Sequence, residues 1–274
     1  MKINYMKITY MKIIFSPRIA LVVAAAIFLH QNVTATTIDL GTASSFAILG
    51  GSAVTFTAPI STVVGDVGVS PGTSITGTPA NLSQTGGTIH NNDGVAAQAQ
   101  LDLKAAYIAA AGLSSTATIP NGLGSGQTLG PGVYKFDLGT TVSLIGTLNL
   151  SGSGLFVFQV PADLQTASGS SVAFSGGADA CDVIWQVSSS ANLLGSDFDG
   201  TILALTSITL GEGVTVDGRL LARNGAVTLI GDNAVVSDCT INVRGVPDTG
   251  STLLLLGSGL AILLAFRQRF FSPA

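Results

Sequence analysis

Charged side chains are scarce in this sequence. Of its 274 residues, 9% are Asp, Glu, Lys or Arg, whereas 47% are hydrophobic. Six of the eleven basic residues lie near the two ends, so residues 36–245 hold five basic residues and fourteen carboxylates, a net charge of −9. An acidic body without a basic stripe argues against nucleic acid as a partner. The abundance of apolar residues excludes a disordered chain.

Histidine is almost absent, which restricts the chemistry available to the protein. The body contains one histidine, His90, and nothing in the sequence marks a particular serine as its nucleophilic partner. A structural or capping role for His90 is therefore favoured. The segment Asp197–Gly200 resembles the start of a calcium loop but lacks the later acidic ligands. We predict that the protein is not an enzyme and has no catalytic residue, no cofactor and no metal ligand.

Cysteine is limited to two residues, Cys181 and Cys239. Their spacing does not match that of a metal site. An even number of cysteines in an exported chain is typical of a disulfide. We therefore predict a bond between these two residues.

Long hydrophobic runs are confined to the two ends, and the first is too short to span a membrane. Residues 19–29 are apolar, follow the basic residues Lys12 and Arg18, and precede small residues at 33–35. Eleven residues fall short of the ~20 that a spanning helix needs. We predict that residues 1–35 form a signal peptide. Because a five-residue unit beginning Met-Lys occurs three times at the start, Met11 is the expected functional start.

The second run lies at the C-terminus. Residues 246–250 (VPDTG) precede an apolar run at 253–266 and then Arg267 and Arg269, an order that stops a chain in a membrane. Residues 246–274 resemble the Val-Pro-Asp-Ser-Gly type of sorting signal, with Thr249 in place of Ser. The resemblance implies a processing peptidase acting at Val246–Gly250 and delivery to the cell surface, outer membrane or extracellular matrix of a Gram-negative bacterium. The alternative is a plain membrane anchor formed by a short transmembrane helix.

Between these ends, one helix is expected among many strands. Residues 92–112 are rich in alanine, with Asn92 or Asp93 placed to cap a helix near 93–111 and Gly112 placed to end it. Leu101, Ala105 and Ile108 follow helical spacing, so we predict that this stripe packs against the body. Elsewhere apolar and polar residues alternate between glycine turns, which is typical of short strands.

The strands recur with a regular period. A five-residue unit of small and polar residues that closes on an apolar residue occurs several times, and the closing residues Phe198, Val216 and Val235 lie 18 and 19 residues apart. This period fits one turn of a three-sided solenoid. Val172 precedes Phe198 by 26 residues, so an insertion is expected in that coil.

Stacked coils would bring equivalent residues into columns. Upstream of the repeated units lie Asn192, Thr209 and Thr228, each between two inward-pointing apolar residues. We predict that these three form a ladder on one outer face, with neighbouring strands ~4.7–4.9 Å apart. The alternative is that threonine is simply a favourable residue on a strand surface.

Several sequence blocks resemble the ice-binding-protein-like family of bacteria and fungi. They lie at 65–72, 96–100, 131–134, 185–187, 200–204 and 218–227, and the similarity covers roughly 38–240. The resemblance implies that residues 36–245 form a mostly β domain, a right-handed β-solenoid of triangular cross-section with one long α-helix packed alongside. It also implies that the coils are not stacked in strict chain order.

The resemblance further implies ice as the ligand of a flat solenoid face, with antifreeze or recrystallisation-inhibiting activity in a secreted or surface-delivered protein. The family motif Thr-[Ala/Gly]-X-[Thr/Asn] is altered here, since the corresponding stretches begin at Ser168, Leu194 and Glu212. The alternative is a structural or adhesive matrix protein that binds extracellular polysaccharide or neighbouring cells. The candidate ice-binding residues are Ser168, Ser171, Asn192, Thr209, Thr215 and Thr228.

Overall fold

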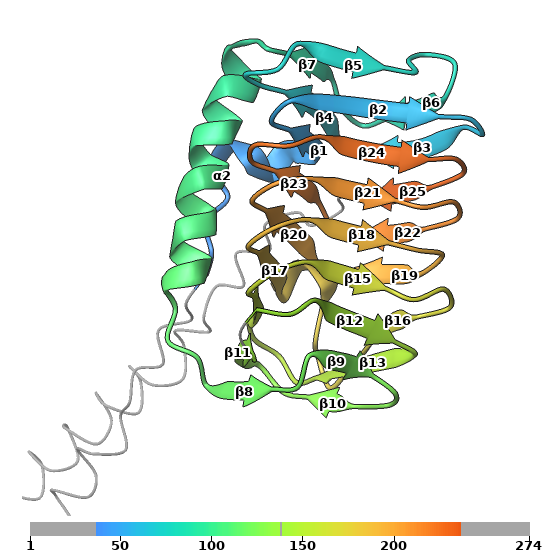
Figure 1. The fold of residues 1–274 in the computed structure, drawn as a ribbon. Coiled ribbons are helices and arrows are strands. Elements are labelled where there is room, and N and C mark those ends of the chain that lie inside the picture. Colours follow the sequence, from blue (N-terminus) through green and yellow to red (C-terminus); the bar gives the residue numbers. More distant parts are fainter. Residues whose placement is uncertain (1–36, 138, 237–274) are drawn as a thin grey trace, which may run out of the picture. The chain divides into compact units, whose positions relative to one another are not determined.

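The computed structural model describes residues 37–137 and 139–236, which form a β-solenoid built from three parallel sheets (Figure 1). Each complete coil contributes one strand to each sheet, so the cross-section is triangular. Every pairing between neighbouring coils is parallel and in register over most of its length, with a shift between Phe46 and Ile48. The predicted fold class is confirmed.

We name the sheets A, B and C in the order in which a coil visits them. Sheet A consists, in stacking order, of β7 (Ile89–Asn91), β4 (Asp66–Val69), β1 (Phe46–Gly50), β23 (Leu220–Ala222), β20 (Thr201–Ala204), β17 (Val183–Val187), β14 (Phe156–Val160), β11 (Gly132–Phe136) and β8 (Ala117–Ile119). Sheet B consists of β5 (Ser74–Thr76), β2 (Ala53–Thr57), β24 (Val227–Ile230), β21 (Ile208–Leu210), β18 (Ala191–Leu193), β15 (Leu164–Thr166), β12 (Val142–Ile145) and β9 (Gly122–Gly124). Sheet C consists of β6 (Leu82–Thr85), β3 (Ser61–Val64), β25 (Ala234–Val236), β22 (Thr215–Asp217), β19 (Asp197–Asp199), β16 (Ser171–Ser175), β13 (Thr147–Ser151) and β10 (Thr128–Leu129).

The coils are not stacked in chain order. The first coil, β1–β3, lies between β4–β6 on one side and the last described coil, β23–β25, on the other. After β7 the chain enters the helix α2 (Gly94–Gly112), which carries it to the far end of the stack, where β8–β10 begin (Figure 1). The remaining coils then stack back towards the first one, and the last described coil pairs with the first coil in the interior of the stack.

The helix α2 begins at a side-chain cap and packs on sheet A. The carboxylate of Asp93 accepts a hydrogen bond from the Ala96 N–H at 2.9 Å, which satisfies one of the free donors at a helix N-terminus. The buried face of the helix consists of Ala96, Ala99, Leu103, Ala106 and Ala110. Small alanines let the helix approach the sheet closely, Leu103 is the one large residue on this buried face, and the half-buried Tyr107 packs beside it.

The predicted apolar stripe on this helix is wrong. Leu101 and Ile108 are 62% and 57% exposed, and Ala105 is exposed as well. The apolar residues of an alanine-rich helix lie on all sides, so helical spacing alone does not select the face that packs. The outward side chains of sheet A, among them Leu203 and Leu221, pack against the alanine face instead.

The interior of the solenoid is apolar, and part of it is aromatic. Trp185 is fully buried and stacks on Phe158, with ring centroids 4.1 Å apart, while the ring of Phe198 is tilted against it at 5.0 Å. The indole N–H donates to the carbonyl of Asp199 at 3.0 Å, so the one polar atom of this ring is satisfied. This packing fixes the position of the coil that contains β17–β19.

Two short 3₁₀ helices complete the fold. η1 (Gly41–Ser45) precedes the first strand, and η2 (Ala180–Asp182) lies between β16 and β17. Because Ser171 pairs with Asp197, the coil that contains η2 is the long one, and the turn at 176–182 supplies the predicted insertion. Among the residues that the structure describes, no helix is long and apolar enough to cross a membrane. The predicted signal peptide (1–35) and sorting segment (246–274) lie outside the described residues.

Candidate binding face

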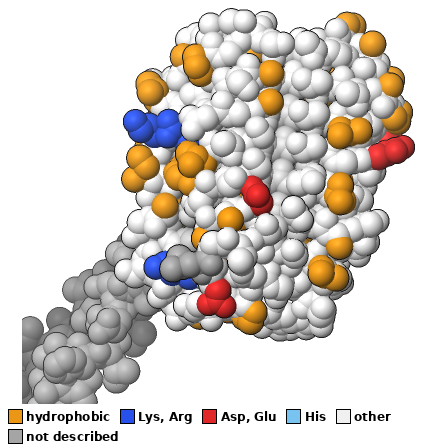
Figure 2. Space-filling view, in the orientation of Figure 1, with side chains coloured by type: hydrophobic (Ala, Val, Ile, Leu, Met, Phe, Trp, Pro, Cys, Tyr) orange, Lys and Arg blue, Asp and Glu red, His pale blue; other side chains and the backbone are white. Residues whose placement is uncertain are grey.

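The three outer faces differ sharply in charge and in cover. Sheet A is partly covered by α2. Sheet C contains carboxylates on adjacent strands, the exposed Asp197 and the half-buried Asp199 on β19 and the exposed Asp217 on β22. None of the eight strands of sheet B contains an Asp, Glu, Lys or Arg residue. Figure 2 shows this side of the molecule as mostly uncharged, with charged side chains few and separate.

A column of polar residues runs down the outside of sheet B. Asn192 pairs with Thr209, and Thr209 pairs with Thr228, so the three predicted ladder residues lie on neighbouring strands in register. In a parallel sheet neighbouring strands are ~4.7–4.9 Å apart, which sets the spacing of the rungs. The predicted ladder is present as a geometric arrangement of side chains.

The column is longer than the sequence period indicates. The register continues from Thr228 to Thr55 and Thr76 on one side, and from Asn192 to Gln165 and Ser143 on the other. The hydroxyls of Thr76 and Thr55 are hydrogen-bonded to each other at 3.2 Å. Sequence spacing missed Thr55 and Thr76 because their strands, β2 and β5, come early in the chain. In the stack, however, these strands lie beyond β24 of the last described coil. The out-of-order stacking implied by the family resemblance was the signal that could have found them.

A second, apolar row runs beside this ladder. Its members are Ile145, Leu194 and Ile230, which are 56%, 46% and 45% exposed. Each lies two residues after a ladder residue, Ile145 and Ile230 at the ends of β12 and β24 and Leu194 directly after β18. Ile230 pairs with Thr57, so the row continues onto β2 as a threonine. Outward residues two apart on a strand are separated by ~6.6–6.8 Å. Sheet B thus presents two parallel rows, one polar and one mainly apolar.

The six candidate residues do not share one face. Ser171 and Thr215 lie on sheet C, and Asp197 lies between them in the same column, where it accepts a hydrogen bond from the Thr215 hydroxyl. The Ser171 hydroxyl is hydrogen-bonded to that of Thr147 at 2.9 Å. Ser168 is exposed in the turn between β15 and β16. Only Asn192, Thr209 and Thr228 are brought together, on sheet B.

The carboxylates of sheet C affect one another. Burial raises the pKa of Asp199 from 3.8 to about 6, and the neighbouring Asp217 and Asp197 charges contribute in the same direction. Asp199 and Asp217 line a depression of about 400 Å³ on this sheet. A charged surface of this kind holds its own hydration shell, which distinguishes it from sheet B.

The residues considered for catalysis and metal binding have structural surroundings. His90 Nδ1 lies 2.8 Å from the Asp93 carboxylate that caps α2, and its ring lies 5.4 Å from that of Phe46. Within the described ranges, no group of three or more His, Cys, Asp or Glu residues is arranged to hold a metal ion. Cys181 takes part in a disulfide, and its predicted partner Cys239 lies outside the described residues, so the pairing stays a prediction.

Two sequence profiles match the chain. That of the ice-binding-like family matches residues 48–235, and that of the VPDSG-CTERM motif matches residues 245–270. An ice-binding protein of Nostoc sp. (strain HG1) is 46% identical over 264 residues, covering 91% of this chain and 94% of the relative. Ice-binding protein K3-B1 of Typhula ishikariensis is 34% identical over 208 residues, covering 69% of this chain and 85% of the relative.

Solved structures with the same architecture are also similar in sequence. The crystal structure of an ice-binding protein from an Antarctic Biological Consortium superposes with a TM-score of 0.69 at 41% identity, covering 75% of this chain and 93% of the other. That of an ice-binding protein from the Antarctic ascomycete Antarctomyces psychrotrophicus gives a TM-score of 0.67 at 38% identity, covering 74% of this chain and 98% of the other.

Proposed function

Because this chain belongs to the ice-binding-like family, we propose that it binds ice, and that it does so through the outer face of sheet B. The observation that carries the proposal is the register of sheet B, which aligns polar residues from Ser143 to Thr76 in one column on strands that contain no charged residue. Binding at the surface of a crystal stops its growth there, so the expected activities are inhibition of ice recrystallisation and a lowered freezing point.

The mechanism depends on repetition in two dimensions. Stacked strands provide one repeat and alternate residues along a strand provide the other, ~6.6–6.8 Å. A threonine hydroxyl anchors a water molecule by donating or accepting a hydrogen bond, while its methyl group limits competing arrangements of water. The adjacent apolar row, with Ile145, Leu194 and Ile230, binds water weakly and leaves it free to adopt the order of the crystal. Each contact is weak, so affinity comes from many contacts on a surface that is ordered beforehand.

The other two faces suit this role less well. On sheet A, α2 covers the outward side chains of several strands. On sheet C, Asp197 interrupts the column that contains Ser171 and Thr215. Of the candidate residues, we therefore place Asn192, Thr209 and Thr228 in the ice-binding face. Ser168 lies in the turn that leads from sheet B to sheet C, and Ser171 and Thr215 lie on sheet C.

A pair of lysine substitutions tests the assignment. Thr209→Lys places a charged, protruding side chain in the middle of the ladder, whereas Thr62→Lys makes the same change at an exposed position of sheet C, where Thr62 pairs with Ala234 and Ser83. The assays are inhibition of ice recrystallisation and adsorption to growing ice. We expect Thr209→Lys to raise the concentration needed for inhibition by about tenfold, equivalent to a loss of ~1.4 kcal/mol. Thr62→Lys should leave it unchanged.

Three outcomes would contradict the proposal. If the unmodified protein neither adsorbs to ice nor inhibits recrystallisation, ice is not its ligand. Equal losses in both variants would show that the effect of lysine is not specific to a face. Loss in Thr62→Lys alone would move the binding face to sheet C.

We also propose that the protein is exported and delivered to the surface of a Gram-negative cell, with processing by a peptidase at Val246–Gly250. The match of residues 245–270 to the VPDSG-CTERM motif supports this. Mass spectrometry of the mature protein tests it: a C-terminus within or next to this motif is expected. A chain that retains residues 251–274 would instead favour a membrane anchor.

The same match favours the second candidate function, adhesion to extracellular polysaccharide or neighbouring cells. Adsorption of the protein to growing ice, measured beside its retention on the polysaccharide of the producing cells, separates the two. Binding to ice alone supports the first function, and binding to the polysaccharide alone supports the second.

A further inference from the structure

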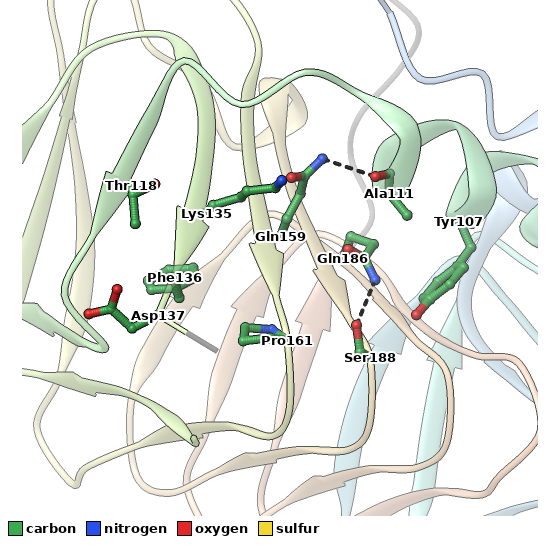
Figure 3. A pocket seen from close by; sticks show the side chains of 10 residues that line it. All are labelled: Tyr107, Ala111, Thr118, Lys135, Phe136, Asp137, Gln159, Pro161, Gln186 and Ser188. Carbon is green, nitrogen blue, oxygen red and sulfur yellow. Dashed lines mark hydrogen bonds between the residues drawn. The ribbon is translucent and has the colours of Figure 1, made fainter. Parts of the chain in front are cut away.

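A cleft lies on the outside of sheet A where α2 ends, and none of its lining residues belongs to a strand of sheet B. Its volume is about 600 Å³, within the range of small-molecule sites. Tyr107 and Ala111, from the last turns of the helix, form one wall. The floor is formed by side chains of β8, β11, β14 and β17 and of the residues that follow these strands (Figure 3).

The floor continues a column of side chains that changes character along the stack. Under the helix, this outward column consists of Leu49, Leu221 and Leu203 on neighbouring strands. Beyond Leu203 the same register continues through Gln186 and Gln159, and then through Lys135 and Thr118. The column thus changes from leucine to polar residues where the helix no longer fills the space above the sheet.

Two amides in this floor are buried. Gln159 is 8% exposed, and its Nε2 donates to the carbonyl oxygens of Ala110 at 2.8 Å and Leu113 at 2.9 Å, which fixes the orientation of the amide. Its Oε1 is buried and accepts no hydrogen bond. Gln186 is 3% exposed and donates to the Ser188 hydroxyl at 3.3 Å. A buried acceptor without a donor is costly, and the hydroxyl of a ligand at this point would supply the donor.

We propose that this cleft binds a neutral saccharide unit. Lys135 and Asp137 lie two residues apart, one on β11 and one directly after it, and both line the cleft. A charged ligand attracted by one is repelled by the other, and an apolar ligand would leave the Gln159 oxygen without a donor. Hydroxyl groups both donate and accept hydrogen bonds. They therefore suit the Gln159 oxygen, the Asp137 carboxylate and the Lys135 ammonium together.

Lys135 lines the same cleft as the Gln159 amide. Figure 3 shows the Lys135 side chain directed towards the amide of Gln159. Lys135 is exposed and its side chain is long, so it can turn towards a ligand hydroxyl as the ligand enters. The cleft and sheet B are formed by different sheets, so saccharide binding and ice binding can occur on one molecule at the same time.

The test is a titration of the full ¹⁵N-labelled chain followed by NMR. The probes are glucose, galactose, N-acetylglucosamine and the β-1,4-linked dimers of glucose and N-acetylglucosamine, with glucuronate and inorganic phosphate as charged comparisons. We expect at least one neutral saccharide to cause saturable shifts of the side-chain amide signals of Gln159 and Gln186 and of the backbone signals of 135–137. The charged probes should cause none at the same concentrations.

Gln186→Leu is the decisive variant because it removes one of the two floor amides, and Leu203 and Leu221 in the same column show that leucine fits there. It should weaken saccharide binding about tenfold or more, equivalent to ~1.4 kcal/mol or more. The matched control is Gln98→Leu, at an exposed position of α2 outside the cleft, which should not change binding. Both variants should inhibit ice recrystallisation like the unmodified protein, which separates this proposal from the proposed function.

The proposal is overturned if no neutral saccharide shifts these signals. It is also overturned if only glucuronate or phosphate does so, or if Gln186→Leu binds the saccharide as tightly as Gln98→Leu.

Discussion

Replacing Asp199 with Asn removes a carboxylate that the fold holds partly out of water. Burial, the Asp217 charge and the Asp197 charge raise its pKa from 3.8 to about 6. Between these two pH values the folded protein binds more protons than the unfolded chain, so stability falls as the pH rises. Without screening by solvent, a pKa difference of this size between the folded and unfolded states lowers the free energy of unfolding by about 3 kcal/mol at neutral pH. Solvent screening of this partly exposed group reduces it to roughly 1–2 kcal/mol.

Asp199→Asn should therefore stabilise the protein at pH 7.5 and have little effect at pH 4. For a body of this size, thermal unfolding should show a rise in Tm of about 3–6 °C at pH 7.5. The substitution keeps the main-chain carbonyl that accepts the Trp185 N–H, so the core contact is retained. The control is Glu212→Gln, which removes the charge of an exposed carboxylate. Equal changes in Tm at both pH values, or a fall at pH 7.5, would refute the electrostatic reasoning.

Two further predictions concern α2. Leu103→Ala should lower the free energy of unfolding by about 2–5 kcal/mol because Leu103 is fully buried against sheet A, whereas Leu101→Ala should change it by less than about 0.5 kcal/mol. Urea unfolding measures both, and a larger effect of Leu101→Ala would mean that the other face of the helix packs. Asp93→Ala should lower the stability of the protein through loss of the N-cap, which acid unfolding followed by circular dichroism measures. The hydrogen bonds from Ala96 and His90 lower the pKa of Asp93, so the stabilisation should disappear as the pH falls below the ordinary range of a carboxylate, and an unchanged acid unfolding curve would contradict this role.

Much of the solenoid could be predicted from the spacing of a few residues. The 18- and 19-residue intervals between Phe198, Val216 and Val235 correspond to three consecutive strands of sheet C, all buried at these positions. The ladder of Asn192, Thr209 and Thr228 has the predicted register because the strands are short and alternate strictly. The resemblances to the ice-binding-like family and to the sorting signal are confirmed.

The assignment of residues to a common face could not be predicted in the same way. Ser171 and Thr215 resemble the ladder residues in type, and they recur with nearly the same period. A period shows which residues are equivalent in successive coils, but it does not show on which sheet of the coil they lie. Two columns on different sheets therefore have the same period. Distinguishing sheet B from sheet C requires the location of the corners, which depends on turns such as the one that contains Ser168.

The packed face of the helix was beyond prediction for a different reason. The large residues Leu101 and Ile108 are exposed, whereas Ala96, Ala99 and Ala106 are buried. Here close approach matters more than hydrophobic area, because outward leucines of sheet A already fill the contact. Only the partner surface decides whether a helix needs large or small residues.

The stacking of the first coil against the last constrains how the molecule is made. β1, β2 and β3 each pair with a strand of the final described coil, more than 160 residues later in the sequence. One edge of the first coil pairs with β4–β6, which follow directly in the chain, but the opposite edge stays unpaired until residues 220–236 have been synthesised. Contacts of such high sequence separation slow folding. A coil duplicated after residue 236 would find the adjacent edge already occupied by β3, so sheet B cannot be enlarged by adding repeats there.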